Sequence, residues 1–290
     1  MDACIKRKHD KKVVIGHGRK PARDSLMLKA MAMVLAKRLP ISPRCTHVKG
    51  HGGGKAAVRE VASHLTDNRF VFRTDVKSYY ASIDHFILLD QLASYINERP
   101  VLNLLGQYLR RRADRGGMFW EYERGISLGC PLSPLIGAFF LKALDDAMAK
   151  LGLFYVRFMD DWLIMSPTRW RLRNAVKIVN QVLVALRLEK HAGKTFIGRI
   201  DRGFDFLGYR FSPSGIAAAK ETIRKFVDRA TQLYEHERGR VDDPSPFGEY
   251  VRRWLGWVDG GFNFRPSRCF ITVAYVSEGT LILPGRYRPS

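Results

Sequence analysis

The sequence predicts an α+β fold with an antiparallel sheet. The first observation is a pair of apolar runs, 153–159 and 162–165, separated by two adjacent aspartates, a pattern typical of two short strands joined by a tight turn. The second is another short apolar strand, 70–76, which also carries an aspartate at its end. The third is the helical periodicity of several longer segments, which predicts helices around the sheet.

The aspartates between the two apolar runs are Asp160 and Asp161. Adjacent carboxylates at a turn repel each other, and a divalent cation would cancel that repulsion. Asp75, at the end of the strand 70–76, would supply a third carboxylate, and three acids together indicate two-metal phosphoryl chemistry. The alternative is an ordinary solvated hairpin turn, because Asp is a common turn residue.

The charge of the chain favours a polyanionic partner. The 290 residues include 49 Lys and Arg against 28 Asp and Glu, a formal net charge of +21. With 46% hydrophobic and 11% aromatic residues, the sequence predicts a folded basic protein and not a disordered basic tail. An anionic membrane surface is the other candidate polyanion, but no run of about 18 apolar residues predicts a spanning helix. Four scattered cysteines, and an N-terminus without the apolar core of a signal peptide, predict a reducing, cytoplasmic location.

Apolar spacing in the first third of the chain predicts a helix over 24–39, with Asp24 at its start and Pro40 at its end. A Gly-rich basic loop follows at 47–55 and leads into a second helix through about residue 65. The loop lacks the spacing of a Walker loop, so a phosphate contact and a plain surface loop both stay open. Beyond the strand 70–76, the pattern predicts two helices and an edge strand, at 83–95, 101–112 and 118–122.

A Gly- and Pro-rich turn at 125–134 leads into a buried helix. Ser133 followed by Pro134 predicts the N-cap and the first position of a helix that ends near Gly152. This helix is apolar on several sides, which is typical of a buried helix. After the acidic hairpin, the pattern predicts an amphipathic helix, a loop and strand, a hairpin, a basic helix and a last helix, at 169–187, 190–197, 204–211, 217–238 and from 250 onward.

Two smaller signals lie in the last third of the chain. Gly208, inside the hairpin 204–211, predicts a bulge or a close approach of the backbone to another group. Trp254 and Trp257 are three residues apart on the last predicted helix. This spacing favours a core pair over a platform on which bases stack.

In this order, the segments resemble the motifs of reverse transcriptases. The resemblance is to the bacterial branch, which comprises group II intron proteins, retron enzymes and the defence-associated or "unknown group" enzymes. It spans about residues 15–262. The similar segments are 21–24 and the loop near Lys55 in the fingers, 74–85, 125–134, 158–161 (the Tyr/Phe-x-Asp-Asp box) and 188–195 in the palm, and 206–209 in the primer grip.

The resemblance implies a right-hand polymerase fold, with fingers at 1–69, a palm with interleaved fingers elements at 70–214, a helical thumb at 215–262 and a C-terminal tail at 263–290. It implies an RNA-directed DNA polymerase that uses two Mg²⁺ ions, with Mn²⁺ as a substitute, and that takes an RNA template, nascent DNA and dNTPs as partners. The tail is too short for a further enzymatic domain. We therefore expect a stand-alone enzyme with its own structured non-coding RNA, as in small antiphage defence systems.

The same resemblance assigns roles at the acids. Asp75 and Asp160 would bridge both ions, the Val76 carbonyl would be a backbone ligand, and Asp161 would complete the cluster. Lys194 would give a proton or a positive charge to the departing pyrophosphate, with a merely solvated lysine as the alternative.

Other residues are implied to contact the nucleotide. Tyr80 lies where the family places an aromatic ring under the sugar; such a ring would exclude a 2′-hydroxyl, and a core tyrosine is the alternative. Gly129 would let the backbone approach the nucleotide or the template. The candidates for holding the triphosphate, among which the sequence does not choose, are Lys20, Arg23 and Lys55.

The primer grip would be formed by Phe206, Leu207, Gly208 and Tyr209. One departure from the family stands beside the second palm motif, where Leu128 replaces a glutamine that many relatives carry. The change removes an amide near the nucleotide sugar. Two rival functions stay open: a palm polymerase that makes RNA, and an RNA-binding or maturase-like helper without essential polymerase activity.

Overall fold

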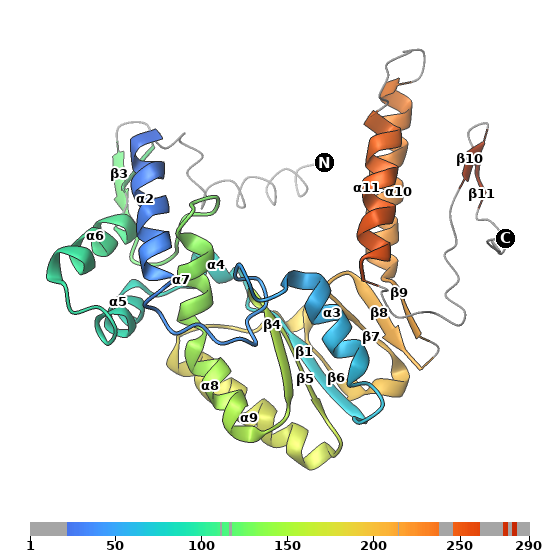
Figure 1. Cartoon of the computed structure of the whole chain (residues 1–290), viewed down its shortest axis with the longest axis horizontal. Helices are drawn as coiled ribbons and strands as arrows, with labels where there is room; N and C mark the ends of the chain where they lie inside the picture. The colour runs from blue at the N-terminus through green and yellow to red at the C-terminus, as the bar shows by residue number, and fades with distance from the viewer. Residues whose placement is uncertain are drawn as a thin grey trace. The chain divides into compact units, whose positions relative to one another are not determined.

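The computed structural model describes residues 22–110, 112–115, 118–213, 215–237, 246–261, 275–277 and 280–282. Their helices and strands are shown in Figure 1. These residues divide into two compact units. The first unit holds 22–57 and 64–199, and the second holds 58–63 and the described residues from 200 onward.

A four-stranded antiparallel sheet forms the centre of the first unit, in the order β4–β5–β1–β6 (Figure 1). Its strands are β1 (Phe70–Thr74), β4 (Phe154–Phe158), β5 (Asp161–Ser166) and β6 (Phe196–Arg199). The predicted acidic hairpin is confirmed as β4 and β5, whose last pair is Phe158 with Asp161. β1 pairs with β5 on one side and with β6 on the other, so segments far apart in the sequence meet in this sheet.

Helices α8 (Lys142–Leu151) and α9 (Arg169–Ala185) belong to the same unit, and α9 packs on β1, β5 and α8. α9 begins where the Thr168 hydroxyl accepts a hydrogen bond from the Arg171 amide, a cap that the sequence favours. Its buried residues recur every three or four positions, which places them on one apolar face. α8 ends at Gly152, whose φ of 58° is a conformation that glycine adopts without strain.

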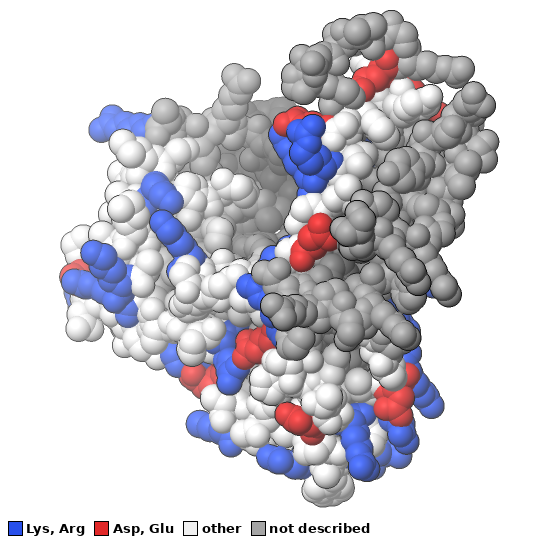
Figure 2. Space-filling view, turned by 45° about the vertical axis from the view of Figure 1, so that its right-hand side comes forward, with Lys and Arg blue, Asp and Glu red and all other residues white. Residues whose placement is uncertain are grey.

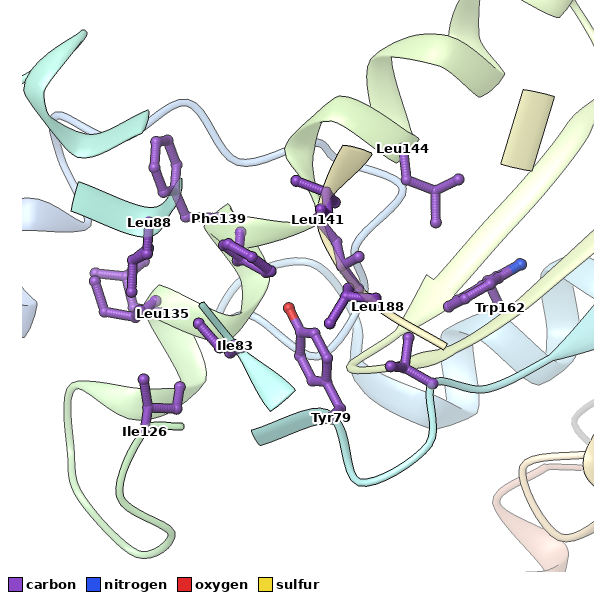
Figure 3. Close-up of a cluster of buried hydrophobic side chains, with 14 of the residues drawn as sticks. Tyr79, Ile83, Leu88, Ile126, Leu135, Phe139, Leu141, Leu144, Trp162 and Leu188 are labelled. Carbon is purple, nitrogen blue, oxygen red and sulfur yellow. The ribbon is translucent and has the colours of Figure 1, made fainter. Parts of the chain in front are cut away.

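An apolar core joins these elements to the other helices of the first unit. Figure 3 shows side chains from several elements converging, among them Tyr79, Phe139 and Trp162, which are 3%, 1% and 0% exposed. Full burial of one such side chain contributes about 1.5–3 kcal/mol, so this shared core holds the helices on the sheet. The other helices of the unit are α2 (Ala22–Leu35), α4 (Tyr79–Ser82), α5 (His85–Ala93), α6 (Arg99–Leu109) and α7 (Ser133–Phe140), with the first turn of α3 (Gly53–Ser63).

The single buried helix predicted after the Gly- and Pro-rich turn is two helices, α7 and α8, separated at Leu141. The prediction that Ser133 caps this helix is also wrong, because Leu132 is the N-cap and Ser133 is already helical. The Ser133 hydroxyl instead bonds to the Ser127 carbonyl and to the Tyr108 hydroxyl. Hydrogen bonds to residues outside the helix therefore use the hydroxyl that would otherwise have capped it.

The helix predicted at 101–112 ends earlier than the sequence indicates. α6 stops at Leu109, and β2 (Arg112–Arg115) then pairs with β3 (Met118–Glu121). Arginine favours helices, but the backbone of this segment gains a strand partner that a helix could not supply. The edge strand predicted at 118–122 is confirmed as β3.

Asp84 sets the start of α5. The helix predicted at 83–95 begins at His85, because one Asp84 oxygen accepts hydrogen bonds from two amides of the first turn, at 3.1 and 3.2 Å. The other oxygen accepts from the Arg187 guanidinium at 3.0 Å. Burial by itself would raise the pKa of Asp84, but these hydrogen bonds outweigh it and lower the pKa below its usual value.

The second unit combines a three-stranded antiparallel sheet with two long helices. The helix predicted at 217–238 starts later than expected, because Ala217 and Ala218 pair with β8. The elements of this unit are residues 58–63 of α3, β7 (Phe204–Phe206), β8 (Tyr209–Ser212), β9 (Gly215–Ala218), α10 (Lys220–Glu237), α11 (Pro246–Asp259), β10 (Tyr275–Ser277) and β11 (Thr280–Ile282).

Aromatic stacking joins the helices and the sheet of the second unit. The Phe226 ring of α10 stacks on Trp254 of α11, with centroids 4.1 Å apart. Trp257 stacks on Tyr209 of β8, with centroids 4.7 Å apart. Each tryptophan therefore stacks on a ring of its own unit and is half-buried. That neither serves as a platform for bases stays a prediction.

Two further expectations concern the membrane and the cysteines. Within the described residues, no helix combines the length and the apolar character that crossing a bilayer requires. Cys45 and Cys130 are buried free thiols, and burial raises the pKa of Cys45 to about 11, so this thiol stays protonated at neutral pH. Cys4 and Cys269 lie outside the described residues.

Asp84→Ala is expected to lower the free energy of unfolding by about 1–2 kcal/mol, because it removes the cap of α5. The pKa of Asp84 lies below 3.8 in the folded protein, so its contribution is present above pH 3.8 and is lost as the pH falls through the folded-state value. Urea unfolding of the variant and the wild type at pH 7 and at pH 3 would measure this, with a smaller difference at pH 3. Asp90→Ala, at an exposed acid of the same helix, should change stability by less than about 0.5 kcal/mol. Equal losses in the two variants would contradict the assignment.

Candidate active site

The strand register brings three aspartates to one end of the sheet in the first unit. β1 ends at Thr74, which lies opposite Trp162 of β5. Asp75 follows Thr74, and Asp161 precedes Trp162, so these two acids come next to each other at the end of the paired strands. Asp160 lies in the two-residue turn between β4 and β5. The antiparallel pairing therefore gathers acids that are distant in the sequence.

Asp75 is 3% exposed, and its two carboxylate oxygens have different surroundings. One oxygen, Oδ2, accepts a hydrogen bond from the Lys194 ammonium. The other, Oδ1, is buried with no hydrogen-bond partner among the described residues. A buried polar atom without a partner costs about 1–3 kcal/mol, and more when it is charged, so a cation beside Oδ1 would stabilise this carboxylate.

Neighbouring carboxylates shift the pKa values of Asp160 and Asp161. Burial raises the pKa of Asp160, and the negative charge of Asp75 adds to the rise. Burial, together with the charges of Asp160 and Asp75, raises the pKa of Asp161 to about 6, against the opposing charges of Lys194 and Arg73. The hydrogen bond to Asp75 raises the pKa of Lys194, which keeps the ammonium protonated at neutral pH. Such mutual repulsion is typical of a site that takes up positive charge.

The chemistry of the donor set suits divalent metal ions, although the spacing of the side chains in this structure does not. Mg²⁺ prefers oxygen ligands, and Asp75, Asp160 and Asp161 supply carboxylate oxygens, one of which has no partner. Among the described residues, no three His, Cys, Asp or Glu side chains are gathered closely enough to hold a metal ion. In this conformation the positive charge at Asp75 comes from the Lys194 ammonium.

The predicted backbone ligand lies directly after the first acid. Val76 is 2% exposed and forms an isolated antiparallel bridge with Lys190. The two hydrogen bonds of this bridge use the Asp75 carbonyl and the Lys77 amide, at 2.9 and 2.8 Å. The Val76 carbonyl takes no part in them, so it keeps its acceptor capacity.

Tyr80 lies near the acids but is also packed. Burial and the charge of Asp160 raise the pKa of Tyr80 to about 12. Its ring stands 5.5 Å from that of Tyr79, and a Cβ added to Gly137 would lie 3.2 Å from it. Tyr80 therefore combines the packing of a core residue with a place beside the acidic turn, and its contact with a nucleotide sugar stays a prediction.

Lys55 lies in the first turn of α3 and is half-buried. It follows Gly54, at which an added Cβ would contact the Phe158 ring at 3.5 Å. Because Phe158 is the last residue of β4, the start of α3 lies against the acidic hairpin. The structure therefore places Lys55, one of the three candidates for the triphosphate, beside this hairpin.

The structure describes two of the remaining nucleotide candidates, Gly129 and Arg23. Gly129 has a φ of +75°, and no described atom lies within 4 Å of an added Cβ, so the space beside it is open. Leu128 is 45% exposed and so is not a core residue. Arg23 is exposed on α2, and Lys20 lies outside the described residues.

The predicted primer grip forms the turn between β7 and β8 in the second unit. Leu207 and Gly208 have φ values of 47° and 84°, as in a type I′ hairpin turn. A Cβ on Gly208 would lie 2.9 Å from the Trp257 ring, so the predicted close approach is confirmed. Phe206 and Tyr209 are buried, and the Tyr209 hydroxyl donates to the Trp257 carbonyl at 2.8 Å. A contact with a primer stays a prediction.

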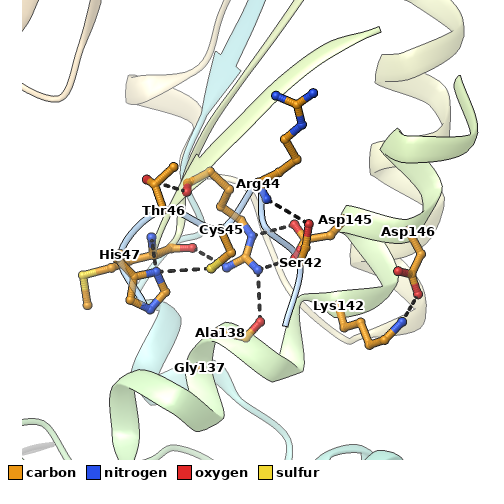
Figure 4. Close-up of polar contacts among 12 residues, drawn as sticks. Ser42, Arg44, Cys45, Thr46, His47, Gly137, Ala138, Lys142, Asp145 and Asp146 are labelled. Carbon is orange, nitrogen blue, oxygen red and sulfur yellow. Dashed lines mark hydrogen bonds and ion pairs between the residues drawn. The ribbon is translucent and has the colours of Figure 1, made fainter. Parts of the chain in front are cut away.

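Sequence reasoning missed three residues behind the acidic turn. Arg157, in β4, is fully buried and pairs with Asp145 of α8, which is labelled with its polar contacts in Figure 4. The signal is present in the sequence, because an arginine inside an apolar run that is predicted to be buried needs a partner. His47 accepts a hydrogen bond from the Met159 amide at 3.0 Å. No pattern around His47 indicates this contact.

An antiparallel sheet that carries three aspartates at the end of adjacent strands, with helices packed on it, defines the palm of a right-hand polymerase. Residues 15–211 match the family model of reverse transcriptase (RNA-dependent DNA polymerase). The chain belongs to the reverse transcriptase family.

The relatives agree with this fold. Protein YkfC of Escherichia coli (strain K12) is 24% identical over an alignment of 233 residues, and the match covers 65% of this chain and 60% of that protein. A telomerase from Candida albicans, in complex with a TWJ fragment of telomeric RNA, matches with a TM-score of 0.52 at 15% identity over 90% of this chain and 49% of that one. A Candida tropicalis telomerase with the same kind of fragment matches with a TM-score of 0.51 at 12% identity, over 87% and 47% of the two chains. The chain thus spans 60% or less of the length of these relatives, and the predicted right-hand fold is confirmed.

Mg²⁺ is expected to raise the midpoint of thermal unfolding, because a dication at the acids removes their repulsion. Binding to the folded state stabilises it by about 1.4 kcal/mol when the ion is at ten times its Kd. Asp160→Asn should lose most of this shift, measured by calorimetry at constant ionic strength. Asp146→Asn, whose carboxylate pairs with Lys142 on the surface, should keep it. A shift as large in Asp160→Asn as in the wild type would contradict the assignment.

Proposed function

We propose that the chain is an RNA-directed DNA polymerase that extends a DNA strand from dNTPs on an RNA template. The observation that carries this proposal is the buried Asp75, with one oxygen unpartnered, beside the turn that holds Asp160 and Asp161. All three lie inside the segment 15–211 that matches the family.

The reaction is attack of a 3′-hydroxyl on the α-phosphorus of a nucleotide, with pyrophosphate as the leaving group. Asp75, Asp160 and Asp161, with the Val76 carbonyl, would hold two Mg²⁺ ions, or Mn²⁺ as a substitute. Such ions stabilise the charge on the attacking and departing oxygens. Asp75 is buried, and Asp160 and Asp161 are half-buried, which lowers the local dielectric and strengthens the charge interactions there.

Lys194 provides the mobile positive charge of the site. It is protonated, and its ammonium is bonded to Asp75 at Oδ2. Its side chain is 57% exposed, so it can leave this carboxylate for another anion at little cost. We assign Lys194 the role of carrying a proton or charge to the departing pyrophosphate.

Charge supports a nucleic acid partner. The chain has a net charge of +21, and Figure 2 shows Lys and Arg side chains spread over the face in view, with fewer Asp and Glu among the described residues. Binding to a phosphate backbone should therefore weaken steeply with salt. The two Candida telomerases are in complex with a TWJ fragment of telomeric RNA, which supports an RNA partner for this chain. An antiphage role and a cytoplasmic location stay predictions.

Asp160→Asn is expected to lower the rate of DNA synthesis on an RNA template by at least about a thousandfold, because it removes a ligand charge from the reacting centre. RNA affinity, measured by filter binding at fixed salt, should stay within about twofold, since the lost charge repels RNA. The matched control Asp146→Asn should leave synthesis unchanged. If cDNA synthesis survives in Asp160→Asn, the polymerase mechanism is wrong; if synthesis is lost but the biological activity persists, the helper function is favoured.

Tyr80→Ala is expected to lower the preference for dNTPs over rNTPs, as a ratio of kcat/KM values, by at least about tenfold. The physical reason is the loss of the ring that would occupy the space of a 2′-hydroxyl. Tyr80→Phe keeps the ring and should keep the preference. A wild-type enzyme that incorporates rNTPs as readily as dNTPs would instead favour a palm polymerase that makes RNA.

A further inference from the structure

Hydrogen bonds to the backbone amide and to the backbone carbonyl of Met159 hold the turn that carries Asp160. The Met159 amide donates a hydrogen bond to Nδ1 of His47 at 3.0 Å. The Met159 carbonyl accepts one from the Arg157 guanidinium at 2.8 Å. His47 and Arg157 thus each hold one of the two peptide units that flank the Cα of Met159, and the second of these units joins Met159 to Asp160.

The turn needs such contacts. Strand pairing ends with Phe158 and Asp161, so Met159 and Asp160 lie beyond the ladder. Met159 has a φ of 57°, a conformation that costs a side-chain-bearing residue about 1–2 kcal/mol relative to the usual regions. The repulsion among the neighbouring carboxylates adds to this cost. Without external contacts, strain and repulsion would both favour another conformation of the turn.

The contacts of His47 define its tautomer. Since the Met159 amide is a donor, Nδ1 must be the acceptor, without a proton. Nε2 lies 3.1 Å from the Pro134 carbonyl, so Nε2 carries the proton and donates it. Burial lowers the pKa of His47, which is consistent with a neutral ring. The ring therefore links the acidic turn to the start of α7.

Arg157 is anchored equally well. Its Nε and Nη2 atoms bond both oxygens of Asp145, at 2.8 and 2.5 Å, and Nη2 also donates to the Ala138 carbonyl at 3.0 Å. The Tyr155 hydroxyl donates to the same carboxylate at 2.8 Å. With its partners fixed on two helices and 0% exposed, the guanidinium has little freedom to move away from the Met159 carbonyl.

The loop that carries His47 is attached to the same strand. The Arg157 amide donates to the Arg44 carbonyl at 2.9 Å, and the Thr46 amide donates to the Arg157 carbonyl at 2.8 Å. Cys45 forms an isolated parallel bridge with Arg157. The backbone of β4 at Arg157 therefore holds the loop of His47 in place. This attachment lies two residues before Met159, which the His47 ring contacts.

We infer that His47 and Arg157 are positioning residues that fix the Met159 backbone and, through it, the carboxylate of Asp160. The inference deepens the proposed function and rests on it, because Asp160 is the metal ligand of that function. His47 is the better residue to test, since loss of the buried Arg157 would leave Asp145 without its partner and endanger the fold.

Two substitutions separate the contacts of His47. Asn places its amide oxygen near the position of Nδ1, so His47→Asn can still accept from Met159. Gln places its amide near Nε2, so His47→Gln can still reach the Pro134 carbonyl but leaves the Met159 amide without its acceptor. His51→Gln is the control, because the His51 side chain bonds the Cys45 carbonyl in the same loop and, among the described residues, makes no hydrogen bond to the turn.

The kinetic test follows primer extension as a function of Mg²⁺ and dNTP. For His47→Gln we expect kcat to fall by about tenfold or more and the half-maximal Mg²⁺ concentration to rise, with the KM for dNTP within about twofold. His47→Asn should recover most of the lost rate, and His51→Gln should resemble the wild type. Equal losses in His47→Asn and His47→Gln, or a His47→Gln enzyme with wild-type kcat and Mg²⁺ requirement, would overturn the inference.

Hydrogen exchange provides a test that does not depend on activity. Peptides covering 158–162 in the full chain should exchange faster in His47→Gln than in the wild type, and at the wild-type rate in His47→Asn and His51→Gln. Unchanged exchange in His47→Gln would overturn the inference whatever the kinetics. Faster exchange in a protein whose wild type makes no cDNA would sustain the structural contact and reject the proposed function instead.

Discussion

The repulsion among three aspartates at one end of a sheet is the constraint on which the rest of the first unit depends. The pairing of β1 with β5 places Asp75 and Asp161 next to each other, and the hairpin adds Asp160. Left alone, this arrangement would disfavour the strand register that creates it. The register is kept because the same strands bury a large apolar core, with Trp162 directly after the acids at 0% exposure. Hydrophobic burial thus holds the charges where solvation would separate them.

Lys194 and Arg157, which come from different segments of the chain, bring positive charge near the acids. Lys194 comes from the segment before β6 and bonds Asp75, and its charge opposes the rise in the pKa of Asp160. Arg157 comes from β4, and its charge has the same direction of effect on Asp160. Because Arg157 is neutralised by Asp145, its field at the acids is weak, and the exposed Lys194 is the group that can be exchanged for another cation. The negative charge of the acids is therefore partly balanced, and another cation can still take the place of Lys194.

The sequence was informative wherever a feature is local. The acidic hairpin, the strand before Asp75 and the turn at Gly208 follow from short patterns of apolar, acidic and glycine residues, and the structure has them where the patterns place them. Features that depend on tertiary partners were not predictable in this way. The break at Leu141 and the hydroxyl of Ser133 are examples, because a buried apolar helix looks continuous in sequence.

The residues of the candidate site differ in the same way, because some follow from local sequence patterns and others depend on distant partners. Its carboxylates could be found because acids next to apolar strands are an unusual pattern. The contact between His47 and Met159 joins residues 112 positions apart, and a histidine in a Gly-rich basic loop carries no local sign of such a partner. Arg157 lies between the two cases, since its charge stands out within an apolar run, but the identity of its partner, Asp145, does not follow from the run itself.

Some residues have a strained backbone conformation that their residue type would not predict. Among the described residues, the non-glycine positions with positive φ are Ser78, Met159, Arg187 and Leu207. Three of them lie within 74–85, 158–161 and 206–209, segments that resemble family motifs, and the fourth, Arg187, bonds the cap of α5. Local preference would place Gly or Asn at such positions, so the surroundings must impose the conformation. At Met159 those surroundings are visible: a histidine on the amide and an arginine on the carbonyl, each fixed to β4 before it reaches the turn. The strain is thus stored next to a catalytic carboxylate by contacts that no single segment of the chain could supply.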